Sequence, residues 1–258
     1  MKKLSILFFL LSFTSMASTN YSIETLVRSF PIGAFAKYTL GKSALFWGDK
    51  AHKRDITYGF IRPELEFRTS GLVNYAGARL SIYPLPIIGF FTGSEIGKRS
   101  LNNLDTFDCD LVQCTGTMRR NILGMRAAIA YKNWFFTTEI RNSILNFSPT
   151  DKPYVDEITT LLGSGEDKTN VQLYVTGLTF SNHQVGLIYL QNKIKNNNST
   201  SSMSSLIHQY NNLKLPFAKD LSKSLLSSLG TFKTRNGKRV LTFLFQLRLN
   251  SAREFLLF

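Results

Sequence analysis

Charged and apolar residues alternate through the stretch from Thr57 to Pro84. Successive side chains of a β-strand point to opposite faces, so a period of two divides the residues of a strand into two sets. Here one set carries most of the charges, and the other is mainly apolar or small. The pattern predicts two antiparallel strands around a short turn, with a charged face backed by an apolar one.

The same alternation recurs along most of the chain. We expect strands at 31–41, 57–84 (the hairpin), 85–95, 121–132, 134–141, 171–180, 184–192, 207–216, 222–234 and 240–249. Polar connections are expected at 42–55, 96–117, 142–168 and 195–205. Asn236-Gly237 predicts a hairpin turn of type I′, because both residues tolerate positive φ angles. In residues 85–95 the glycines suit a sharply curved wall.

No apolar run after residue 17 approaches the roughly 20 residues that a membrane-spanning helix needs. The chain is therefore soluble or enters a membrane as strands. The dense charged face, the apolar face behind it and their repetition predict an all-β fold, an antiparallel transmembrane β-barrel of about 10–12 strands. A soluble β-sandwich is the competing fold.

The first 17 residues have the three parts of a secretory signal peptide. Lys2 and Lys3 form a positive start, residues 4–13 are apolar, and Ser15-Met16-Ala17 is a small-residue cleavage site. We expect cleavage after Ala17, which leaves residues 18–258 as a single barrel domain.

The chain resembles bacterial outer-membrane β-barrel proteins in its signal peptide, its repeated alternating segments and its final aromatic residue. The resemblance implies location in the outer membrane, contact with its lipid and lipopolysaccharide, and recognition by the barrel-assembly machinery. Leu256 and Phe258 match the terminal signal of that class, whereas Glu254 departs from its apolar alternation. The ladder at 241–249 and the last residues differ in parity, which predicts a turn or bulge near 250–252.

Composition and cysteine content refine this prediction. Lys and Arg number 31 against 17 Asp and Glu, for a net charge of +14. This balance favours anionic partners, such as lipopolysaccharide phosphates, anionic solutes or nucleic acid, or reflects a generally basic surface. Of these partners, we do not expect nucleic acid. Cys109 and Cys114 predict a disulfide that closes a short exported loop, worth about 2 kcal/mol in the chain-entropy model. No metal or cofactor is expected.

Residue pairs typical of outer-membrane enzymes give little support for catalysis. Phospholipase-like and deacylase-like barrels have a His-x-Ser pair, but His52, His183 and His208 lack serine at the second position. Omptin-like proteases combine Asp-x-Asp with Asp-x-His, and Asp108 and Asp110 match only the first half. We therefore expect no enzyme, although a site built from residues distant in sequence, such as that of a lipid-modifying enzyme, remains an alternative.

The better functional candidate is the charged face, which would line the lumen of a barrel. Its members are Arg62, Glu64, Glu66, Arg68, Arg79, Arg126, Glu139, Arg141 and Arg248. Any register that keeps the apolar faces together places Glu64 or Glu66 across from Arg79. These charges either fill a closed structural barrel as ion pairs or line a narrow pore that favours anions.

A surface binding or adhesion barrel is the alternative, in which basic clusters contact lipopolysaccharide. The clusters are Arg119 and Arg120 after the cysteine loop, and Lys233, Arg235, Lys238 and Arg239 at the last hairpin. The number of subunits is left open.

Overall fold

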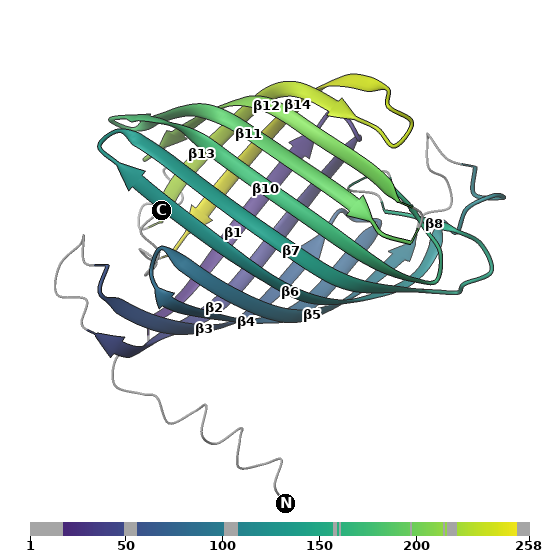
Figure 1. The fold of residues 1–258 in the computed structure, drawn as a ribbon, viewed down its shortest axis with the longest axis horizontal. Coiled ribbons are helices and arrows are strands. Elements are labelled where there is room, and N and C mark those ends of the chain that lie inside the picture. Colours follow the sequence, from purple (N-terminus) through teal and green to yellow (C-terminus); the bar gives the residue numbers. More distant parts are fainter. Residues whose placement is uncertain are drawn as a thin grey trace, which may run out of the picture.

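The computed structural model describes residues 18–48, 56–100, 108–156, 159, 161–196, 198–213, 215 and 221–251. Within these residues, twelve long strands form one closed antiparallel barrel (Figure 1). The predicted all-β barrel is confirmed, and closure rules out the β-sandwich. No helix in this part of the chain is long and apolar enough to cross a membrane. The expected signal peptide, and Leu256 and Phe258, lie outside the described residues.

Neighbouring strands follow the order β1-β14-β13-β12-β11-β10-β7-β6-β5-β4-β3-β2, and β2 pairs with β1. The wall consists of β1 (Ser18–Arg28), β2 (Gly33–Gly48), β3 (Tyr58–Thr69), β4 (Val73–Leu85), β5 (Ile88–Ser100), β6 (Thr115–Tyr131), β7 (Trp134–Ser148), β10 (Glu166–Phe180), β11 (His183–Ile194), β12 (Ser199–Asn211), β13 (Ser222–Lys233) and β14 (Arg239–Asn250). A separate two-stranded sheet pairs β8 (Tyr154–Val155) with β9 (Leu162–Gly163).

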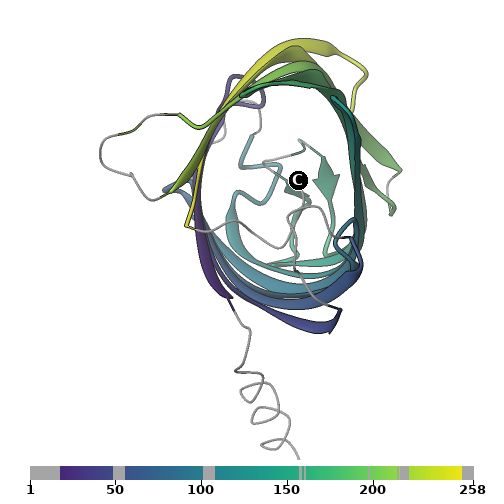
Figure 2. The same cartoon turned by 90° about the vertical axis from the view of Figure 1, so that its left-hand side faces the viewer.

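The barrel has two unlike ends. The terminal end, at the left of Figure 1, holds the start of β1 and the end of β14. The loop end, at the right, holds the β5–β6 and β7–β10 connections together with β8 and β9. Figure 2 shows the small sheet lying within the ring of strands rather than outside it.

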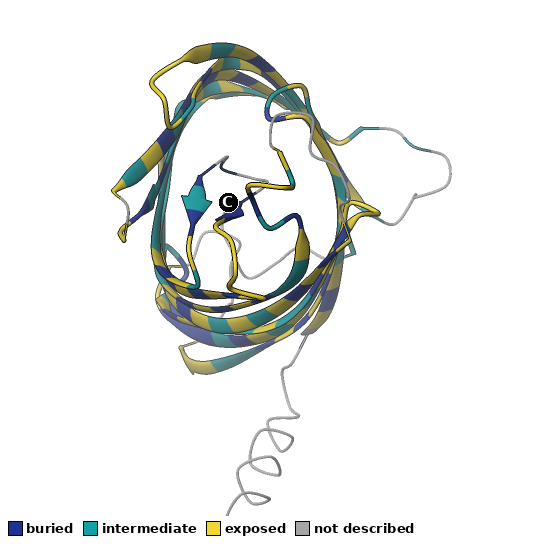
Figure 3. Cartoon of the chain, turned by 90° about the vertical axis from the view of Figure 1, so that its right-hand side faces the viewer, coloured by how far each residue is buried: buried dark blue, intermediate teal, exposed yellow. Residues whose placement is uncertain are grey.

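The outer face is apolar across the middle of the wall. Leu65 and Phe67 on β3, and Phe243 and Phe245 on β14, are large hydrophobic side chains that remain about half exposed. Figure 3 shows exposed and more buried residues alternating as stripes along the strands. An apolar outer face of this kind is suited to hydrocarbon, which cannot satisfy polar groups.

Several strands are longer than their alternation predicts. β1 was not expected at all, β2 and β7 run on to Gly48 and Ser148, and β5 and β6 extend into the predicted loop 96–117. Lumen-facing positions and strand ends outside the bilayer accept polar residues, so the added parts of β2, β5, β6 and β7 do not continue the apolar alternation. Pairing with neighbouring strands, rather than local pattern, fixes these ends.

The polar run 195–205 was predicted to be a loop, and this is wrong. Ser199–Asn211 is β12, which pairs with β11 and β13 on its two sides. Ser201 and Ser205 point inward and are buried. Serine on both faces hides the alternation, whereas the ladder hydrogen bonds of two neighbours hold the segment extended.

The turn at Asn236-Gly237 is also not the predicted type I′. Only Gly237 has a positive φ, of 79°, and the turn is closed by bonds from Gly237 N to Thr234 O and from Thr234 N to Lys238 O. This is the pattern of a longer hairpin loop with a glycine bulge.

Two inward glycines of β5 make room for aromatic rings of β4. A Cβ at Gly89 would collide with the ring of Tyr83, and one at Gly97 would collide with the ring of Tyr75. These glycines therefore place two tyrosines flat against the inner wall.

Candidate functional site: the charged lumen face

The predicted ladder residues project inward from five strands. They are Arg62, Glu64, Glu66 and Arg68 on β3, Arg79 on β4, Arg126 on β6, Glu139 and Arg141 on β7, and Arg248 on β14. Each has at least one outward apolar neighbour, as Glu64 and Glu66 have in the exposed Leu65. Together with the inward charges of β1, β2 and β5, these residues form a surface that we call the charged lumen face.

Ion pairs connect the ladder along and across strands. Arg62 lies 3.0 Å from Glu64, and Arg126 lies 3.1 Å from Glu139 across the β6–β7 pair. Glu64 is the residue directly opposite Arg79, but the ion pair of Arg79 is with Glu66, at 3.6 Å. Interleaved signs hold the side chains against the wall.

The seam that closes the barrel carries an ion-pair cluster that the sequence did not suggest. Glu24 on β1 accepts from both Lys37 on β2 and Arg248 on β14, each at 3.3 Å. It was missed because β1 was missed. The signal was present in the alternation of outward Tyr21 and Ile23 with inward polar residues.

A second missed cluster joins the wall to the loop end. Arg120 on β6 donates to Glu95 on β5 at 2.6 Å and lies 3.5 Å from Asp156 of the β7–β10 connection. Arg120 was assigned to a basic surface cluster, but its side chain is inward and buried. Its neighbour Arg119 points outward and is exposed.

The connections at the loop end fold onto this inner wall. The predicted disulfide between Cys109 and Cys114 is confirmed. The two loops and the wall share one apolar cluster, made of Val73, Tyr75, Val112, Cys114, Met118, Leu145, Phe147, Tyr154 and Val155. Tyr154 donates a 3.0 Å hydrogen bond to buried Asp167 of β10, and the ring of Tyr154 stacks on Phe147.

Because Tyr154 is buried next to the Asp167 carboxylate, its pKa lies well above the ordinary tyrosine value. The phenol therefore stays protonated and keeps donating its hydrogen bond. The connections narrow the loop end of the lumen, mainly over β4–β7.

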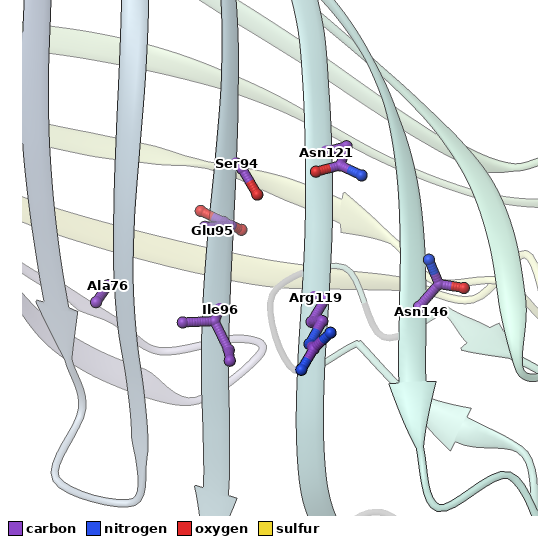
Figure 4. Close-up of a pocket in the computed structure, with 7 residues that line it drawn as sticks. All are labelled: Ala76, Ser94, Glu95, Ile96, Arg119, Asn121 and Asn146. Atoms are coloured by element: carbon purple, nitrogen blue, oxygen red, sulfur yellow. The ribbon is translucent and has the colours of Figure 1, made fainter. Parts of the chain in front are cut away.

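A pocket of about 530 Å³, lined by both polar and apolar groups, lies on the wall near the loop end (Figure 4). Its lining residues are Ala76, Ser94, Glu95, Ile96, Arg119, Asn121 and Asn146. Arg119 and the two asparagines give it donors on the outer face. On the neighbouring strands, Asn170 donates to Asn142 at 2.9 Å and Gln172 donates to Asn170 at 3.1 Å. Polar groups on β5, β6, β7 and β10 therefore interrupt the apolar outer face near the loop end.

The histidine and aspartate candidates form no known catalytic constellation among the described residues. His183 and His208 contact each other on the outer face at 3.0 Å, and Ser227 donates to the backbone carbonyl of His208 rather than to its imidazole. Asp108 caps its own loop by accepting from the Asp110 amide. No group of three or more metal-ligating side chains occurs in the described part of the chain.

A closed antiparallel wall that is apolar outside and charged inside defines a transmembrane β-barrel of the outer-membrane type. No protein-family model matches the sequence, and no curated protein matches it.

Several solved outer-membrane barrels have similar structures. The translocator domain of autotransporter NalP from Neisseria meningitidis is 9% identical over 98% of this chain and 94% of that chain, with a TM-score of 0.38. OmpT, an outer membrane protein of Vibrio cholerae, is 7% identical over 91% and 97%, with a TM-score of 0.41. The β domain of the Bordetella autotransporter BrkA is 10% identical over 92% and 98%, with a TM-score of 0.39.

Proposed function

We propose that this protein is a bacterial outer-membrane barrel that forms a narrow pore favouring anions. The observation that carries the proposal is the charge balance of the inner wall, where basic side chains outnumber acidic ones. The inward basic residues are Arg28, Lys37, Arg62, Arg68, Arg79, Arg99, Arg120, Arg126, Arg141 and Arg248, and the inward acidic residues are Glu24, Glu64, Glu66, Glu95, Glu139 and Asp167.

Several side chains on this wall are only partly buried, which supports access for solvent and ions. The side chains of Arg126 and Glu139 are 27% and 26% exposed, and that of Arg248 is 49% exposed. Surplus positive charge lowers the energy of an anion in a confined lumen and raises that of a cation. The loops at the loop end and the ion pairs along the wall keep such a pore narrow.

Conductance in a planar bilayer tests this proposal. Under a KCl gradient, the refolded mature barrel is expected to give small unitary currents. Their reversal potential should be displaced from zero toward the equilibrium potential of chloride. Arg79→Gln removes an inward charge and should move the reversal potential toward zero. Arg119→Gln removes the same charge from the outer face and should leave it nearly unchanged. Absence of any current would overturn the pore and leave a closed structural barrel.

A second candidate function is binding of lipopolysaccharide or another anionic lipid on the outer wall. The pocket around Arg119 favours it, because a guanidinium with nearby amide groups suits a phosphate and its sugar. The Arg119→Gln barrel, purified from outer membranes, should retain less lipopolysaccharide than the Arg235→Gln barrel, which loses one charge at the hairpin turn. Equal retention would remove this pocket as the lipid site.

We further propose a non-enzymatic role, with export by the signal peptide and recognition of Phe258 by the assembly machinery. Deleting Phe258 should lower the amount of heat-modifiable barrel in the outer membrane without changing signal cleavage. Undiminished assembly would refute the role of Phe258. Incubation of the barrel with labelled phospholipid or lipopolysaccharide should leave the acyl chains unchanged, and their release would refute the non-enzymatic role.

A further inference from the structure

The inner wall is divided into two unlike halves. The charged lumen face covers β1–β7 and includes Arg248 of β14, whereas no inward side chain from Thr169 to Phe232 is charged within the described residues. This second half, which we call the apolar lumen face, lies on β10–β13. Its large members are Val171, Leu173, Val175, Ile188, Leu190, Ile194, Met203, Ile207, Leu226 and Phe232.

The central part of the apolar lumen face is not packed as a core. On β10 and β11, Val171, Leu173, Val175, Ile188 and Leu190 are all only partly buried although they point into the barrel. The aromatic cluster under β3 and β4 is different, because Tyr58, Phe60 and Tyr83 there are at most 2% exposed. A small barrel can fill its interior with its own side chains, so accessible inward apolar surface indicates room for an apolar occupant.

An unpaired arginine stands where the two halves meet. Arg141 of β7 lies directly across from Val171 of β10, and Glu139 lies across from Leu173. Glu139 is bound by Arg126, whereas Arg141 has no ion pair with any residue that the structure describes. The Nε of Arg141 is buried and has no hydrogen-bond partner. The like charges of Arg120 and Arg79 repel this guanidinium, whereas the opposite charges of Glu139 and Glu95 attract it.

An anionic group therefore finds a free guanidinium immediately beside partly accessible aliphatic side chains. A carboxylate, sulfonate or phosphate can accept two hydrogen bonds from one arginine. An alkyl chain attached to that group would lie over Leu173 and Leu190, which are opposite each other on β10 and β11. A small inorganic anion would use only the arginine and would leave the apolar surface wet.

We propose that the lumen binds amphipathic organic anions, with the head group at Arg141 and the alkyl chain on the β10–β11 part of the apolar lumen face. This inference rests on the proposed function in that the ligand reaches its site through the lumen. Binding and conductance are separate measurements, so the two proposals can fail independently.

Calorimetric titration of the barrel in lipid nanodiscs, with empty nanodiscs as the blank, tests the site. The probes are straight-chain alkyl sulfonates of four to eight carbons and the alcohols of equal length. Each methylene buried against an aliphatic wall strengthens binding by up to about fourfold. We expect the Kd to fall by at least about twofold per methylene, and each sulfonate to bind at least about tenfold more tightly than the matching alcohol.

Two pairs of variants separate the head-group site from the chain site. Arg141→Gln should remove the preference for sulfonate over alcohol, whereas Arg248→Gln, which deletes the same charge on the far side of the lumen, should keep it. Leu173→Ser should flatten the dependence on chain length, whereas Leu226→Ser should not. Leu226 lies three strands from β10, and neighbouring strands are about 4.8 Å apart, beyond the reach of a short chain anchored at Arg141.

The outcomes distinguish this inference from the pore. Chain-length-dependent binding without any conductance would support the lumen site and overturn the pore. Conductance with sulfonate binding that is independent of chain length, or equal binding of sulfonate and alcohol, would overturn the lumen site and leave the pore. Each variant must show the heat-modifiable mobility of the parent barrel, which separates loss of binding from loss of folding.

Discussion

The link between the inner wall and the loop end makes the sharpest prediction. Arg120 contacts Glu95 on the wall and Asp156 on the β7–β10 connection, and all three carboxylate and guanidinium groups are largely buried. Arg120→Gln keeps a polar side chain of similar reach but removes the charge. Both carboxylates then remain in a site with little water, and the connection loses its ionic anchor.

The magnitude follows from the burial of the pair. Removing one partner of a buried ion pair costs about 3–5 kcal/mol, because the other charge is left uncompensated. Arg68 still lies 3.9 Å from Glu95 in the variant, so we take the lower end, about 3 kcal/mol. A loss of that free energy is expected to raise the equilibrium constant for local opening of the docked loop by about a hundredfold. The strand ladders of the barrel are untouched.

Hydrogen exchange read by mass spectrometry measures this opening. The amide of Gln113 donates to Pro153 O at 2.7 Å and that of Asp156 donates to Leu161 O at 2.9 Å, so both report on the docked loops. Their peptides should exchange about a hundredfold faster in Arg120→Gln, with unchanged exchange in the wall. Arg119→Gln is the matched control, one residue away and outward. Unchanged exchange in Arg120→Gln, or an equal rise in the control, would refute the reasoning.

Three further predictions concern the loop and the lumen. Burial beside an aspartate raises the pKa of Tyr154, so the contribution of this phenol to loop docking is complete below about pH 10 and is lost as the pH rises toward the raised pKa. Difference absorbance between the parent and Tyr154→Phe should show that Tyr154 ionises at a higher pH than ordinary tyrosines. Ionisation of Tyr154 near pH 10 would contradict this prediction. Replacing Cys109 and Cys114 by serine should speed exchange within 108–114 by about thirtyfold, the equivalent of about 2 kcal/mol, without lowering the melting temperature of the barrel; a barrel that melts earlier would show that the disulfide supports the wall. Glu66→Gln should move the reversal potential further toward the equilibrium potential of chloride. A shift toward the equilibrium potential of potassium would exclude a lumen position for this charge.

Local pattern was sufficient for the class of fold and for part of the inner wall. In β3 and β4, charged and apolar sets separate cleanly, so the sequence predicts that Arg62 to Arg68 share one face and that Glu64 or Glu66 lies near Arg79. The reason is that a strand presents its two faces at a period of two, whatever its partners. The short spacing of the two cysteines likewise restricts the disulfide to one loop.

Local pattern failed wherever both faces of a strand have the same character. In β12 both faces carry serine, so the strand read as a loop. In β10 and β11 both faces are apolar in part: Leu173 and Leu190 point inward, whereas Leu178 and Leu187 point outward. Which set lines the lumen depends on the neighbours to which each strand is hydrogen-bonded.

The sequence by itself determined an alternating all-β chain with a charged face, an apolar face and one disulfide loop. Only the tertiary structure decided that β1 and β14 close the wall, that Arg120 anchors a loop within it, and that Arg141 stands unpaired beside an accessible apolar half. The physical reason is that alternation is a property of one strand, whereas register, closure and the sharing of ion pairs depend on contacts between residues far apart in the chain, such as Glu24 and Arg248.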